Sequence, residues 1–320
     1  MNPATEPSYY SLPTAASTTP PISNAFLELV SPIAPAPAPS ATESEREFSL
    51  VADFLKFYGL RENPFADSIQ PRFFYRTESH ADAFRNMMLA VDFEASLGLV
   101  TGTSGAGKTL ISQLLLDQLP STRYCVALVL VTPGLSRSGL LQEILSELSV
   151  ALPVGTPRVQ DLLRLLSNQI MNLHEHGKRL VLIFDECHFL SAECLHVIRT
   201  ISNIETIDRK LTTSILIGES RLLQRLTHPS FESLRNRIYL RSELQCLKVE
   251  ESAQYLKFRL MTAGRFANLF TEAALVALHE ATGGNCRRLN KLAMLAIVTG
   301  AREGRHAIDE SIVARCASLQ

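Results

Sequence analysis

Residues 102–109 constrain the fold of this chain more than any other part of its sequence. They read Gly-Thr-Ser-Gly-Ala-Gly-Lys-Thr and so match GxxxxGK[ST] at every fixed position. An apolar run at 97–101 precedes them and an amphipathic run at 108–119 follows. The motif therefore joins a predicted strand to a predicted helix, which is the context that a phosphate-binding loop requires.

The chemistry of this loop predicts ATP with Mg²⁺ as its ligand. Glycines let successive backbone N–H groups turn toward phosphate oxygens, and the N-terminus of the following helix adds a positive dipole. We expect Lys108 to neutralise the β and γ phosphates and the Thr109 hydroxyl to bind the metal. The predicted nucleotide-binding residues of the loop are Gly102, Thr103, Ser104, Gly105, Ala106, Gly107, Lys108, Thr109 and Leu110.

A pair of adjacent carboxylates follows a second apolar strand. Residues 180–184 read LVLIF and lead directly into Asp185 and Glu186. In a chain that also carries a phosphate-binding loop, Asp185 is expected to hold Mg²⁺ and Glu186 to act as the general base for water. Asp185, Glu186 and Lys108 are therefore the predicted catalytic residues of this chain.

Strand-like and helix-like runs alternate from about residue 48. Such alternation predicts an α/β fold with a five-stranded parallel sheet covered on both faces. The predicted strands are 97–101, 124–131, 180–184, 213–217 and 238–240, and the helices between them are 108–119, 139–149, 159–174, 192–204 and 230–237. Because run 124–131 lies between the two nucleotide strands in sequence and lacks an acidic end, we expect it to supply an additional central strand between them.

Composition divides the chain into three predicted parts. Residues 1–45 are rich in Pro, Ala, Ser and Thr and are expected to be a disordered tail, in which the apolar residues 25–30 are a candidate docking motif. Residues 46–245 are the predicted ATPase core. Residues 246–320 form a predicted helical lid, with helices expected at 250–263, 271–281, 287–299 and 309–318.

Charge and hydropathy give no sign of a membrane or nucleic-acid partner. The formal net charge is −1, from 31 Lys and Arg against 32 Asp and Glu. No apolar run is long enough to span a bilayer, no secretory signal is seen, and the six cysteines form no CxxC pair. We therefore expect a cytoplasmic protein without direct membrane insertion.

Several separated motifs together resemble one family. Residues 57–65 (FYGLRENPF), 183–188 (IFDECH), 234–238 (LRNRI) and 284–290 (GNCRRLN) occur in the order seen in AAA+ ATPases of the ExeA type, the general secretion pathway protein A family. TnsC-type transposition regulators are related to that family. The resemblance covers the chain from residue 57 to the C-terminus and implies the additional-strand AAA+ fold of P-loop NTPases.

The resemblance also implies roles for three arginines. Arg235 and Arg237 are candidates for an arginine finger that reaches a neighbouring subunit, and Arg287 for the sensor-2 residue of the lid. A finger acting in trans implies a homo-oligomer. Two positions depart from the family pattern: Glu219 stands where a neutral sensor-1 side chain is usual, and Cys286 replaces a proline.

Three functional hypotheses remain open from the sequence. The first is an ATPase that assists a secretion or pilus assembly through a protein partner. The second is an ATP-dependent transposition regulator that binds duplex DNA and a transposase. The third is a scaffold that ATP orders without being hydrolysed.

Overall fold

The computed structural model of the chain describes residues 54–66 and 71–319. The predicted tail, including the candidate docking motif at 25–30, lies outside these residues. The described part contains a five-stranded sheet in the order β2-β3-β4-β1-β5, with every neighbouring pair parallel. The strands are β1 (Leu97–Gly102), β2 (Tyr124–Leu130), β3 (Arg179–Asp185), β4 (Thr212–Glu219) and β5 (Ile238–Leu244). The predicted α/β class and parallel sheet are confirmed.

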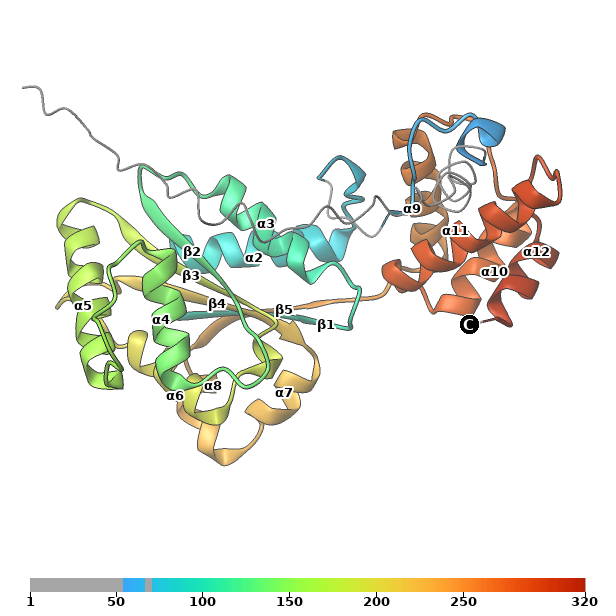
Figure 1. The fold of residues 1–320 in the computed structure, drawn as a ribbon. Coiled ribbons are helices and arrows are strands. Elements are labelled where there is room, and N and C mark those ends of the chain that lie inside the picture. Colours follow the sequence, from blue (N-terminus) through green and yellow to red (C-terminus); the bar gives the residue numbers. More distant parts are fainter. Residues whose placement is uncertain (1–53, 67–70, 320) are drawn as a thin grey trace, which may run out of the picture. The chain divides into compact units, whose positions relative to one another are not determined.

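The side chains of each central strand alternate between two hydrophobic layers. On β3, Leu182 and Phe184 join the layer under α4 (Arg137–Glu147), α5 (Val159–Glu175) and α6 (Ala192–Ile201). Val181 and Ile183 join the opposite layer under α2 (Glu78–Asp92) and α3 (Lys108–Gln118). Because both faces are covered (Figure 1), the central strands are continuously apolar rather than alternating in sequence.

The additional central strand is β4, and not the strand that we predicted for that place. β4 pairs with β1 on one side and β3 on the other, whereas β2 pairs only with β3 and forms a sheet edge. The prediction for 124–131 was wrong because it inferred spatial order from sequence order. The half-exposed pattern of β2, with Leu130 65% exposed, is the one expected of an edge.

Helices α2 and α7 (Arg221–Leu226) of the described chain were not predicted from the sequence. α2 covers the sheet beside α3, and α7 follows β4. The predicted helix at 230–237 is a short 3₁₀ turn, Pro229–Phe231, followed by α8 (Glu232–Arg235). The buried residues of α2 do recur at helical spacing, but they include His80 and two alanines, and α7 has only 6 residues, too few for a clear periodicity.

Four helices follow the sheet and form a separate hydrophobic cluster. They are α9 (Val249–Thr262), α10 (Glu272–Thr282), α11 (Cys286–Arg302) and α12 (Glu310–Ala317). Aromatic side chains from the start of the described chain, Phe54, Tyr58, Phe65 and Phe73, are buried in the same cluster. The cluster is therefore built from segments at both ends of the described chain.

The predicted domain boundaries stay predictions.

In the ranges that the structure describes, no helix has the combination of length and hydropathy needed to cross a membrane.

Candidate nucleotide-binding site

The predicted phosphate-binding loop connects β1 to α3. Gly105 and Gly107 have φ angles of 78° and 87°, in the left-handed region that favours glycine. A Cβ atom on Gly105 would lie 2.7 Å from the Cβ of Arg287, and one on Gly107 would lie 2.7 Å from Nε2 of His80. Both conformation and space therefore require glycine at these two positions of the loop.

Lys108 is the first residue of α3 and is only 5% exposed. Its ammonium donates a hydrogen bond to the carbonyl of Thr103 at 3.0 Å, across the loop. No carboxylate among the described residues forms an ion pair with it. A largely buried cation without a carboxylate partner favours binding of an anion. The loop thus has the charge and shape that a phosphate group requires.

Asp185 and Glu186 lie at the carboxyl end of β3. Asp185 is 2% exposed, and its carboxylate accepts hydrogen bonds from the Ser112 hydroxyl (3.3 Å) and from the Glu186 backbone N–H (2.8 Å). Glu186 has a φ of 56°, a left-handed conformation that costs a non-glycine residue about 1 kcal/mol or more. Such strain is concentrated at functional sites, and here it accompanies a side chain that lines the same pocket as Lys108.

His188 connects Glu186 to Glu219 at the end of β4. Its Nδ1 lies 3.2 Å from a carboxylate oxygen of Glu186 and 3.3 Å from the backbone N–H of Glu219. A neutral ring can make only one of these two hydrogen bonds, because Nδ1 either donates or accepts. Burial lowers the pKa of His188, an effect that the Glu219 charge partly offsets.

Glu219 is part of a charged group. The Glu219 carboxylate pairs with Arg221 at 3.1 Å and lies 3.9 Å from Nε2 of His188. The residue that departs from the family pattern thus belongs to a chain of polar contacts that leads to Glu186.

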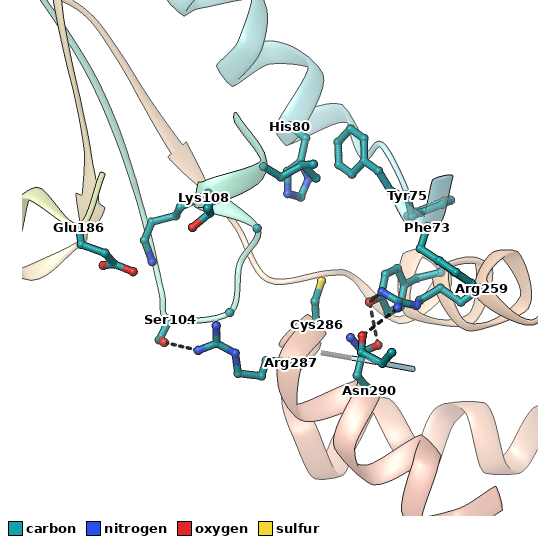
Figure 2. A pocket seen from close by; sticks show the side chains of 17 residues that line it. Phe73, Tyr75, His80, Ser104, Lys108, Glu186, Arg259, Cys286, Arg287 and Asn290 are labelled. Carbon is teal, nitrogen blue, oxygen red and sulfur yellow. Dashed lines mark hydrogen bonds between the residues drawn. The ribbon is translucent and has the colours of Figure 1, made fainter. Parts of the chain in front are cut away.

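The N-terminus of α11 contacts the phosphate-binding loop. Asn285 caps this helix by accepting from the Arg288 N–H, and its amide donates to the carbonyl of Ser104 at 2.6 Å. Arg287 donates to the Ser104 hydroxyl at 3.2 Å (Figure 2). Two residues at this helix end, Asn285 and Arg287, therefore both contact Ser104.

The other end of the pocket is aromatic. Phe73, Tyr75 and Tyr255 line it, and the Arg259 guanidinium lies 4.9 Å from the centroid of the Phe73 ring (Figure 2). Tyr255 donates its hydroxyl proton to Asn290 at 2.8 Å, and burial raises the pKa of Tyr255 to about 12. This wall offers flat apolar faces beside hydrogen-bonding groups.

The structure brings together many, but not all, of the predicted site residues. Eight of them line the pocket: Ser104, Gly105, Gly107, Lys108, Thr109, Leu110, Glu186 and Arg287. Gly102, Thr103 and Ala106 belong to the loop but are not among the residues that line the pocket, and Asp185 is buried.

Arg235 and Arg237 lie outside the described lining of this pocket. Arg235 donates to the carbonyls of Leu226 and Thr227 and so caps the end of α7. The pocket of a single chain therefore gives no role to either arginine.

The pocket also contains residues that were not predicted as site residues from the sequence. They are Ala66, Phe73, Phe74, Tyr75, His80, Tyr255, Arg259, Cys286 and Asn290. Residues 57–65 were noted as a family motif, but no spacing in the sequence shows that the segment after them reaches the loop.

Comparison with known proteins identifies the domain that contains the loop and Glu186. Residues 91–226 match the family model of the AAA domain. The chain contains an AAA domain. It is also 34% identical over 257 residues to general secretion pathway protein A of Aeromonas hydrophila, which confirms the predicted resemblance. The aligned part covers 80% of this chain and 46% of that protein, so the chain spans less than half of this relative's length.

Solved structures of AAA+ proteins share the fold. The Aeropyrum pernix ORC2 protein, in its ADPNP–ADP complexes, superimposes with a TM-score of 0.60 at 18% identity, covering 80% of this chain and 71% of that one. Cdc6p from Pyrobaculum aerophilum gives 0.58 at 16% identity, covering 77% and 67%. The predicted AAA+ fold of the P-loop NTPases, with helices after the sheet, is confirmed.

Proposed function

We propose that this AAA+ protein binds ATP with Mg²⁺ and hydrolyses it to ADP and phosphate. The observation that carries the proposal is the buried Lys108 ammonium, held in a loop of left-handed glycines and facing a pocket that Glu186 also lines. The loop and Lys108 follow β1 and Glu186 follows β3, yet they line one pocket.

The loop end of the pocket suits a triphosphate. Residues 102–110 supply backbone N–H groups, and Lys108 supplies a positive charge for the β and γ phosphates. Thr109, whose hydroxyl makes no hydrogen bond within the described part of the chain, and the buried Asp185 would hold Mg²⁺, which neutralises phosphate charge when bound. Arg287, beside Ser104, is placed to contact the phosphates from the lid side.

The aromatic end of the pocket suits a purine base. The rings of Tyr75 and Tyr255 lie 6.1 Å apart at an interplanar angle of 70°. An aromatic base packs favourably on such faces, and the Asn290 amide beside Tyr255 offers hydrogen bonds to its edge. The two ends of the pocket therefore match the two ends of ATP.

Glu186 is the proposed general base. Its carboxylate would accept the proton of the attacking water, and Nδ1 of His188 lies 3.2 Å from it. A general base of this kind contributes roughly 10²- to 10⁴-fold to the rate.

We further propose that the protein acts in the cytoplasm as a homo-oligomer that assists a secretion or pilus assembly. The similarity to general secretion pathway protein A supports this choice of process. Completion of the site by Arg235 or Arg237 of a neighbouring subunit would make hydrolysis depend on assembly.

Binding and turnover of ATP test the catalytic proposal. Lys108→Ala is expected to lose most of its ATP affinity, measured by calorimetry, whereas the exposed Lys56→Ala is expected to bind like the wild type. Glu186→Gln is expected to bind ATP but to release phosphate roughly 10²- to 10⁴-fold more slowly. The matched control is Glu193→Gln, an exposed carboxylate on α6. Wild-type affinity in Lys108→Ala contradicts the proposal.

The two other hypotheses are outcomes of the same experiments. Equal, negligible turnover in the wild type and in Glu186→Gln, despite tight ATP binding, identifies a scaffold. ATP-dependent binding of plain duplex DNA that weakens steeply with salt identifies a DNA-binding regulator.

A further inference from the structure

His80 lies in the first turn of α2, and its ring fills the space between this helix and the phosphate-binding loop. The residue is 4% exposed. Its Nε2 lies 2.9 Å from the carbonyl oxygen of Ala106, and its Nδ1 lies 2.6 Å from the hydroxyl of Thr77. Figure 2 shows the ring beside the loop on the side away from Arg287.

These contacts select one tautomer of the ring. The Ala106 carbonyl can only accept, so the proton lies on Nε2, and Nδ1 accepts from the Thr77 hydroxyl. Thr77 is also the N-cap of α2 and accepts from the His80 backbone N–H at 3.3 Å. Burial lowers the pKa of His80, which agrees with a neutral ring. Thr77, at the start of α2, thus helps to fix Nε2 of His80 as the nitrogen that donates to the loop.

The hydrogen bond from His80 to the Ala106 carbonyl also fixes the orientation of the next backbone N–H, that of Gly107. The carbonyl of Ala106 and the N–H of Gly107 belong to one planar trans peptide and point in opposite directions. Because the Ala106 carbonyl points to His80 on α2, the Gly107 N–H points away from α2. The missing Cβ of Gly107 leaves the room that the His80 ring occupies.

We infer that His80 is a positioning residue, which orients the Gly107 amide toward a bound phosphate. The inference rests on the proposed binding of ATP. His80 also belongs to the segment that carries Phe74 and Tyr75 into the pocket, and its ring meets Phe74 edge to face at 5.7 Å. The segment that lines the base end of the pocket therefore also sets the geometry of the phosphate end.

The ratio of affinities for ATP and for adenosine tests this role. If His80 only fills space, its substitution changes the affinity for both ATP and adenosine. If it orients a phosphate-binding amide, its substitution changes only the affinity for ATP. His80→Phe keeps a ring but loses the donor, and we expect ATP affinity to fall about 5- to 30-fold while adenosine affinity stays unchanged. His80→Gln, whose amide reaches the position of Nε2, is expected to restore ATP affinity to within about 3-fold of the wild type.

His80→Asn keeps the test decisive if the phenylalanine variant does not fold. Its amide is one methylene shorter than that of glutamine and cannot reach Ala106, so it is expected to lose ATP affinity as His80→Phe does. Equal ATP-to-adenosine ratios in His80→Gln and His80→Asn overturn the inference. If Lys108→Ala binds ATP like the wild type, the proposed function itself fails, and the two failures are distinguishable.

Discussion

The Arg287 guanidinium donates a hydrogen bond to the Ser104 hydroxyl, so a residue of α11 contacts the loop between β1 and α3. A guanidinium at this place is close to where phosphate oxygens would lie. We expect Arg287→Ala to weaken ATP binding about tenfold or more and to leave adenosine binding unchanged. The control is Arg288→Ala, because Arg288 donates instead to the carbonyl of Ala281. An equal loss in both variants would assign the effect to the fold of α11.

Arg235 and Arg237 are expected to differ in their effects. Arg235 caps α7, so Arg235→Ala should lower the free energy of unfolding by roughly 1 kcal/mol, measured by urea denaturation. The side chain of Arg237 makes no hydrogen bond or ion pair within the described ranges, so Arg237→Ala should leave stability unchanged. If Arg237 is the finger, this variant loses roughly 10³-fold or more in turnover of the assembled protein. Normal turnover in Arg237→Ala would exclude it as the finger.

Glu219 places a negative charge where the resemblance implies a neutral side chain. A carboxylate near the γ-phosphate disfavours the triphosphate, so Glu219→Gln is expected to raise the rate of phosphate release several-fold. Arg221→Ala, which removes the cation that pairs with Glu219, is expected to lower it. Steady-state turnover checks both, and a slower Glu219→Gln would indicate that the carboxylate is needed to hold His188.

Stability should depend on pH through His80. Burial is the largest cause of its lowered pKa, while the hydrogen bond to Ala106 and the charge of Glu251 act in the opposite direction. The unfolded chain, with an ordinary histidine pKa of about 6.5, therefore binds a proton before the folded protein does. The stability that the neutral His80 ring contributes is complete above the unfolded-state pKa of about 6.5. It is lost as the pH falls through the lower folded-state pKa.

Urea unfolding at pH 7.5, 6.5 and 5.5 measures this contribution. His80→Gln cannot titrate there, so the stability difference between wild type and variant is expected to shrink or change sign at the lowest pH. Carboxylates titrate in both proteins and cancel in the difference. A difference that stays constant across the range contradicts the prediction.

Four strands were predictable because they are short, apolar runs, whereas β5 was predicted only over 238–240 because Arg241, Ser242 and Glu243 interrupt its apolar pattern. The same runs did not reveal their spatial order, since β4 and β2 look alike in sequence while pairing and exposure distinguish them. The phosphate-binding loop and Asp185 with Glu186 could be proposed because their chemistry requires neighbouring residues. Their roles remain predictions.

His80 and Tyr255 could not be found in this way. Each reaches the pocket through contacts with residues distant in sequence, Ala106 for His80 and Asn290 for Tyr255. Periodicity and motif spacing report only on neighbours along the chain. Such residues become visible only when tertiary structure brings the segments together.

The cluster that joins Phe54 and Phe73 to α9 through α12 has a consequence for biosynthesis. The aromatic segment is translated well before its partners, which lie between Leu247 and Cys316. At typical rates of ~5–20 residues per second, these side chains would wait for tens of seconds without their partners. During that interval the nascent chain exposes large apolar groups, and a chaperone that shields them would favour correct folding.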